Sequence, residues 1–167
     1  MERLILKHSG PLKGTVHVSG SKNAALPIMA ACLLTDDECV IEGVPRVTDV
    51  SSMAKILRVV GVGVIEDDQR LVIRPGGYTG WTAPYELVSL MRASVCVLGP
   101  LLAKQRRAQV AMPGGCVLGQ RPIDLHLKGL AALGAELTTE HGDIVAHAPR
   151  LRGTRIHLGG AFGSSVL

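Results

Sequence analysis

The sequence predicts a mixed α/β fold built from repeated units, each made of a helix, a strand, a second helix and a strand hairpin. Two observations carry this prediction. The segment ILRVVGVGV around Gly61 reads like the segment GLAALGAEL around Gly134, 73 positions later. The same offset carries Ser21 to Ser94, and both serines open an apolar helical run. We therefore expect two units of the same architecture in succession.

The first unit is preceded by an expected strand over residues 14–18. Within the unit, apolar residues spaced three and four apart indicate helices, and alternating residues indicate strands. The polar residues 67–69 indicate a hairpin turn. The expected elements are a helix over 23–34, a strand over 38–42, a helix over 47–60 and a hairpin over 62–73.

The second unit follows the same pattern, and its hairpin is expected to turn at residues 141–143. Its expected elements are a helix over 89–103, a strand over 109–112, a helix over 123–133 and a hairpin over 135–147. A last strand is expected over 154–158, and Ser165 then stands at the start of a third apolar helix, as Ser21 and Ser94 do in their units. Because the chain stops there, we expect a fragment of a longer polypeptide; the alternative is a short frayed tail on a complete domain.

Composition excludes several classes of function. The 167 residues include 18 Lys and Arg against 14 Asp and Glu, a net charge of +4, and 47% are hydrophobic, so the chain can bury a substantial core. Only 2% are aromatic, which argues against a surface that stacks nucleic-acid bases and requires a core of aliphatic side chains. The mild positive charge favours a small anionic ligand.

Membrane insertion, secretion and metal chemistry are not expected. The longest apolar runs, residues 24–34 and 93–103, fall short of the roughly 20 residues of a membrane helix. The N-terminus alternates charged and apolar residues, unlike a signal peptide, so a cytoplasmic location is expected. Four cysteines without a C-x-x-C pair predict free thiols, and the six histidines form no metal-binding spacing, so no metal or cofactor is expected.

Two cationic positions stand at expected helix starts. Lys22 and Asn23 follow Gly20 at the start of the first helix, where unpaired N–H groups and the helix dipole favour a phosphate or carboxylate. The alternative is that Ser21 or Asn23 caps the helix while Lys22 is solvated. Arg92 occupies the matching corner of the second unit, where its guanidinium could bind an anion in bidentate fashion. The alternative for Arg92 is a surface ion pair with Glu86.

The segment 112–126, MPGGCVLGQRPIDLH, is the most specific motif. Its glycines allow close approach of the backbone to a ligand, and Cys116 stands among residues that cannot bury it. Arg121 could favour the thiolate or hold an anion. Pro122 and Asp124 suit the first turn of the following helix. The other cysteines lie in apolar stretches and are expected to be buried: Cys32, Cys39 and Cys96.

Five short sequences together resemble the enolpyruvyl transferase family, and within it the UDP-N-acetylglucosamine 1-carboxyvinyltransferases of peptidoglycan synthesis. They are GSKNAALP at 20–27, MRAS at 91–94, LGPL at 98–101, PGGC at 113–116 and GQRPIDLH at 119–126. The resemblance implies two domains, each an inside-out α/β barrel of three repeated units, with the active site between them.

The resemblance also implies a division of this chain. Residues 1–21 would form a strand segment that belongs to the second domain, and residues 22–167 would be a partial first domain, with two units and the start of a third. A carboxylate that acts on the sugar hydroxyl and a further arginine would lie in the C-terminal half of the polypeptide. This chain alone is therefore expected to be inactive.

The implied reaction transfers the enolpyruvyl group of phosphoenolpyruvate to the 3-hydroxyl of UDP-N-acetylglucosamine and releases phosphate. Cys116 would donate the proton and would be the site alkylated by fosfomycin, and phosphoenolpyruvate would lie against Lys22, Arg92 and Arg121. The nucleotide sugar would contact Asn23, Arg121, Pro122, Ile123, Asp124, Leu125, Ala161, Phe162, Gly163 and Ser164. Residues 161–164 depart from the family's Pro-Ser-Val-Gly pattern.

Two other functions stay open. One is the related enolpyruvyl transfer to shikimate 3-phosphate, against which Asn23 and the PGGC sequence argue. The other is a catalytically silent module that keeps only the nucleotide-sugar surface.

Overall fold

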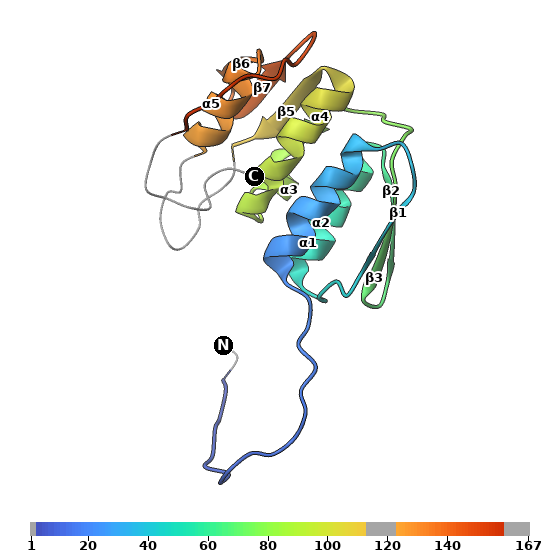
Figure 1. Ribbon diagram of the computed structural model, residues 1–167, viewed down its shortest axis with the longest axis vertical. Coiled ribbons are helices and arrows are strands. Elements are labelled where there is room, and N and C mark those ends of the chain that lie inside the picture. Colours follow the sequence, from blue (N-terminus) through green and yellow to red (C-terminus); the bar gives the residue numbers. More distant parts are fainter. Residues whose placement is uncertain (1–2, 113–122, 159–167) are drawn as a thin grey trace.

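The computed structural model describes residues 3–112 and 123–158, which form two helix-and-sheet units (Figure 1). The first unit begins with helix α1, which continues as a short 3-10 turn, η1. Its elements are α1 (Lys22–Ala31), η1 (Cys32–Leu34), β1 (Cys39–Glu42), α2 (Thr48–Val59), β2 (Gly63–Asp67) and β3 (Arg70–Arg74). All of the elements expected for this unit are therefore present, with ends shifted by a few residues.

The second unit has the same core order with additional short elements at its start. Its elements are β4 (Thr82–Ala83), α3 (Tyr85–Val88), the 3-10 helix η2 (Arg92–Val97), α4 (Leu98–Gln105), β5 (Arg107–Ala111), α5 (Asp124–Ala132), β6 (Glu136–Glu140) and β7 (Asp143–His147). Strand β4 was not predicted. It pairs in parallel with β5, and the guanidinium of Arg107 lies 3.3 Å from the centre of the Trp81 ring beside it.

Sheet topology confirms the repeat. The strand orders are β1-β3-β2 in the first sheet and β4-β5-β7-β6 in the second, so β1, β3 and β2 correspond to β5, β7 and β6. The hairpins also share one register: Gly63 pairs with Arg74, and Glu136 pairs with His147, each 73 positions later. A one-residue slip would turn the buried side chains to solvent, so a shared register means a shared inner face.

The two units differ in the length of one connection. Glu42 of β1 pairs with Arg70, and Ala111 of β5 pairs with Asp143, which is 73 positions after Arg70. Ala111, however, follows Glu42 by only 69 positions. Because α2 and α5 end 73 positions apart, the second unit has four additional residues between its first strand and the end of the following helix. The segment 112–126 falls in this longer connection.

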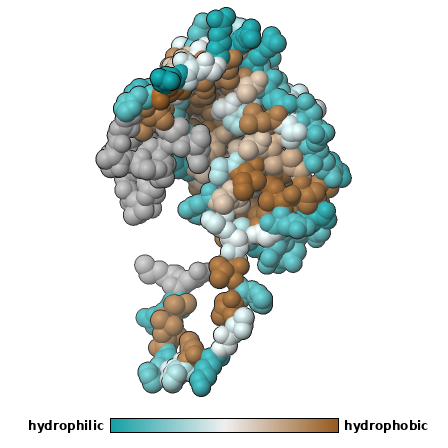
Figure 2. All heavy atoms as spheres, in the orientation of Figure 1, coloured by the Kyte–Doolittle hydropathy of each residue, from teal (hydrophilic) through white to brown (hydrophobic). Residues whose placement is uncertain are grey.

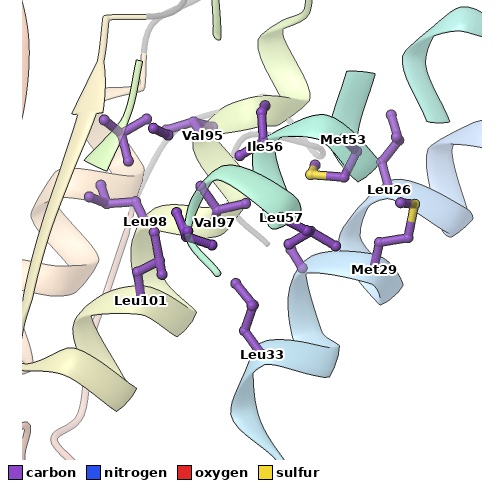
Figure 3. Packing of buried hydrophobic residues seen from close by; sticks show 14 of the residues in the cluster. Leu26, Met29, Leu33, Met53, Ile56, Leu57, Val95, Val97, Leu98 and Leu101 are labelled. Atoms are coloured by element: carbon purple, nitrogen blue, oxygen red, sulfur yellow. The ribbon is translucent and has the colours of Figure 1, made fainter. Parts of the chain in front are cut away.

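The core lies where the helices of the two units meet, and α1 packs against both α2 and η2. Aliphatic and methionine side chains fill it, as the scarcity of aromatic residues requires. Figure 3 shows 14 of these side chains and labels ten: Leu26, Met29, Leu33, Met53, Ile56, Leu57, Val95, Val97, Leu98 and Leu101. Among the described residues, no helix has the length and apolar character needed to cross a membrane.

Three expectations about local structure were wrong. Residues 14–18 and 154–158 form no strand, although their residues alternate. A strand is stable only where a neighbour completes its hydrogen-bond ladder, and neither segment pairs with one here. Residues 3–20 are all exposed, and their apolar side chains show as brown spheres on the arm below the body in Figure 2.

The expected helix over 89–103 is broken into η2 and α4. Ser94 is fully buried, and its hydroxyl lies 2.6 Å from the carbonyl oxygen of Met91, to which it donates a hydrogen bond. This bond stabilises a tight turn in place of a regular helical turn. Pro100 lacks a backbone N–H and is tolerated because it lies in the first turn of α4.

Candidate functional site

Lys22 and Asn23 are the first two residues of α1, and both are exposed. The carbonyl oxygen of Ser21 accepts the N–H groups of Ala24 and Ala25, but its hydroxyl makes no capping bond. Gly20 immediately precedes this turn and lies so close to the carbonyl of Gly43 that a Cβ would collide with it. The start of α1 is therefore held directly against the connection that leads to α2.

Lys22 is not simply solvated, because its ammonium group forms an ion pair with Asp49. The Nζ to Oδ2 distance is 2.6 Å, and Asp49 lies in the first turn of α2. Asp49 was not among the predicted site residues. Sequence reasoning had no signal for it, because the two residues are 27 positions apart and meet only when α1 and α2 pack.

Arg92 is the first residue of η2 and is partly buried. Ser94 holds the turn that presents it, through the hydrogen bond to Met91. The charge of the Arg92 guanidinium affects the pKa values of two neighbouring side chains, Cys96 and His126. Burial raises the pKa of Cys96 while the charge of Arg92 opposes that rise. The pKa of His126 is lowered, mainly by burial and to a smaller extent by the positive charge of Arg92, while the negative charge of Asp124 acts to raise it.

The start of α5 meets the same corner. Ile123 is 7% exposed and precedes the helix, Asp124 is its exposed first residue, and Leu125 is partly buried. His126 follows, and its Nδ1 atom is buried without a hydrogen-bond partner. The structure therefore brings Arg92, Asp124 and His126 together. His126 was quoted in the motif but not predicted as a site residue.

His126 makes the fold sensitive to acid. Because its pKa in the folded chain is below the ordinary value of 6.5, the unfolded chain binds the additional proton first as pH falls. We expect the contribution of His126 to the free energy of unfolding to be constant above about pH 6.5 and to decrease as the pH falls below that value. The measurement is urea unfolding, followed by Trp81 fluorescence, between about pH 5 and pH 8.

The matched control is the exposed His141, at a turn with φ of 51°, a conformation that asparagine also adopts. His126→Gln should remove part of the acid dependence, and His141→Asn should leave it intact. An acid dependence unchanged in His126→Gln would contradict the assignment.

The described cysteines are free, and two of them are poor nucleophiles. Burial, and then the neighbouring Cys39 side chain, raises the pKa of Cys32 to about 12. Burial likewise raises the pKa of Cys96. Cys32 is buried, as predicted, whereas Cys39 and Cys96 are only partly buried against the core. The described residues include no group of three or more side chains suited to hold a metal ion.

Seven of the predicted site residues lie outside the described ranges: Cys116, Arg121, Pro122, Ala161, Phe162, Gly163 and Ser164. Their roles stay predictions. In the described part, a cationic residue begins one helical segment in each unit: Lys22 is the first residue of α1, and Arg92 is the first residue of η2. Helices α1 and α2 both begin at the lower end of the body in Figure 1. This end can attract an anion.

This chain is similar in sequence to a known family model and to named enzymes of that family. The family model described as EPSP synthase (3-phosphoshikimate 1-carboxyvinyltransferase) matches residues 6–167. The chain is 51% identical over all 167 residues to the UDP-N-acetylglucosamine 1-carboxyvinyltransferase of Methylacidiphilum infernorum, and 48% identical over 158 residues to that of Lawsonia intracellularis. It spans 39% and 38% of these relatives, respectively.

Solved structures agree on the fold. The enolpyruvyl transferase NikO from Streptomyces tendae matches 87% of this chain, which spans 32% of NikO, with a TM-score of 0.73 at 21% identity. EPSP synthase from Acinetobacter baumannii matches 89% of this chain, which spans 35% of that structure, with a TM-score of 0.68 at 17% identity. The fold is thus that of part of an enolpyruvyl transferase, and the chain belongs to the EPSP synthase (3-phosphoshikimate 1-carboxyvinyltransferase) family.

Proposed function

We propose that this chain is part of an enzyme that transfers the enolpyruvyl group of phosphoenolpyruvate to the 3-hydroxyl of UDP-N-acetylglucosamine, in the cytoplasm, for peptidoglycan synthesis. The observation that carries the proposal is the 51% identity, over the whole chain, to a relative named for that activity. The exposed Lys22 and the partly buried Arg92 support it, because phosphoenolpyruvate carries a carboxylate and a phosphate.

In the proposed reaction, Lys22, Arg92 and Arg121 hold the anionic groups of phosphoenolpyruvate. The thiol of Cys116 gives its proton to the methylene carbon, and the neighbouring carbon gains positive character that the sugar 3-hydroxyl attacks. That hydroxyl gives its proton to a carboxylate in the remaining part of the polypeptide. The carbon–oxygen bond to phosphate then breaks, phosphate leaves with the bonding electrons, and a proton of the new methyl group returns to the Cys116 thiolate. Asn23, residues 121–125 and residues 161–164 would hold the nucleotide sugar.

We also propose the division into residues 1–21 and 22–167. The apolar side chains of Leu4, Ile5 and Leu6 are 74–85% exposed, which supports packing of this segment on another domain. Helix α5 buries no residue, unlike α2, and a cavity of about 220 Å³ lies between α4 and α5. Four residues lining it, His126, Gly129, Leu130 and Leu133, lie 73 positions after the fully buried Met53, Ile56, Leu57 and Val60.

The first unit shows what covers such a seam. There, η2 packs against α1 and α3 packs against α2. By the repeat, the corresponding part of a third unit would cover the seam between α4 and α5. The remaining part of the polypeptide would then complete the first domain and add the second, so the 167-residue chain should be inactive by itself.

The test is a chimera in which this chain replaces the matching segment of the Methylacidiphilum infernorum relative. We expect phosphate release from phosphoenolpyruvate with UDP-N-acetylglucosamine, and none from the 167-residue chain alone. Shikimate 3-phosphate is the second acceptor, because the matching family model bears that enzyme's name. Turnover with shikimate 3-phosphate only, or none beside an active parent enzyme, would contradict the proposal.

A further inference from the structure

The ion pair between Lys22 and Asp49 joins the first turns of α1 and α2. The ammonium nitrogen lies 2.6 Å from one carboxylate oxygen, a distance typical of a strong charge-assisted hydrogen bond. The side chain of Lys22 is 48% exposed and that of Asp49 is 30% exposed. The pair is therefore open to solvent on the lysine side and more enclosed on the aspartate side.

The electrostatics of the two helices explain why an acidic residue is needed here. Each helix N-terminus carries partial positive charge, and Lys22 adds a full charge at one of them. The first turn of α1 contains no acidic residue, whereas Asp49 lies in the first turn of α2. Asp49 thus neutralises Lys22 from the neighbouring helix.

The backbone limits the freedom of the pair. Gly20 lies against the carbonyl of Gly43, so the segments entering α1 and α2 touch just before the two charged residues. An ammonium group has three donors, and the bond to Asp49 occupies one of them. The other donors remain available to an incoming anion, with Asp49 fixing the direction in which they point.

We propose that Asp49 is a positioning residue that holds the Lys22 ammonium group toward the phosphoenolpyruvate site. This inference rests on the proposed function, in which Lys22 binds phosphoenolpyruvate. It predicts that loss of the carboxylate charge weakens phosphoenolpyruvate binding specifically. A residue with a merely structural role would affect both substrates alike.

The experiment compares Asp49→Asn and Asp49→Glu in the chimera described above, with both substrates varied. For Asp49→Asn we expect the KM for phosphoenolpyruvate to rise about tenfold, the loss expected for a hydrogen bond between charged groups. The KM for UDP-N-acetylglucosamine should stay within about twofold of the wild type. Asp49→Glu keeps the charge and should recover part of the loss.

The matched control is Asp36→Asn, which removes another exposed ion pair, to Lys104 at 2.8 Å, and should leave all constants unchanged. An unchanged KM for phosphoenolpyruvate in Asp49→Asn, beside an active wild-type chimera, would overturn the positioning role alone. Equal losses for both substrates, or equal losses in Asn and Glu variants, would overturn it as well. A wild-type chimera without turnover would overturn the proposed function together with this inference.

Discussion

Cys116→Ser is expected to lower turnover of the chimera by about 10²- to 10⁴-fold, the usual contribution of a general acid. A thiol can give up a proton near neutral pH, whereas a serine hydroxyl is a far weaker acid. If Cys116 protonates the methylene carbon, the variant keeps the shape of the side chain and loses the proton donor. The loss should therefore appear in kcat, measured as phosphate release at saturating concentrations of both substrates.

Cys39→Ser is the matched control, because Cys39 is partly buried in β1, outside the proposed site, and serine can keep its contact with the carbonyl of Asp37. A second measurement is labelling of the protein with fosfomycin, with the covalent adducts counted from the mass of the intact protein. We expect one adduct, at Cys116, that disappears in Cys116→Ser, because burial raises the pKa of Cys32 and of Cys96. Turnover retained in Cys116→Ser would refute the role of the thiol.

Gly61→Ala should destabilise the chain far more than Gly134→Ala, although the two glycines occupy the same place in the repeat. Their φ angles are 96° and 97°, so alanine is strained at either position, by about 1–3 kcal/mol. At Gly61, a Cβ would also lie 2.5 Å from the Thr79 nitrogen and 2.6 Å from the Gly77 oxygen. At Gly134, its nearest neighbour would be the Arg150 oxygen at 3.7 Å.

The collision at Gly61 involves backbone atoms, which cannot rotate away as a side chain would. We expect Gly61→Ala to cost more than about 4 kcal/mol, in the range reserved for overpacked or strained sites. Urea unfolding of the 167-residue chain, followed by Trp81 fluorescence, measures both variants. Equal losses would show that segment 77–79 moves aside freely.

The elements that were predictable from sequence are those decided by local patterns. Both hairpins were located because a polar turn separates alternating residues, and the similar segments around Gly61 and Gly134 showed the repeat. Residues 14–18 show the limit of such patterns. Alternation describes a side-chain arrangement, but a strand also needs a partner, which no local pattern supplies.

The candidate site likewise contains residues that local sequence patterns reveal and residues that only the packing of helices reveals. Lys22 and Arg92 were predictable as anion-binding candidates because each precedes an apolar helical run, and Asp124 because its negative charge suits a helix start. Asp49 and the burial of His126 were not, since both depend on which helices pack together. The 3-10 form of η2 was missed because the buried hydroxyl of Ser94 reshapes the turn, an effect that apolar spacing does not reveal.

The four additional residues between β5 and the end of α5 leave the hairpin that follows in the same register as its counterpart in the first unit. The difference in length at this place thus leaves the pairing of the hairpin strands unchanged. Foreign peptides or altered reactive sequences grafted there should change chemistry while the scaffold keeps its melting behaviour. The connection between β5 and α5 is accordingly the segment best suited to redesign.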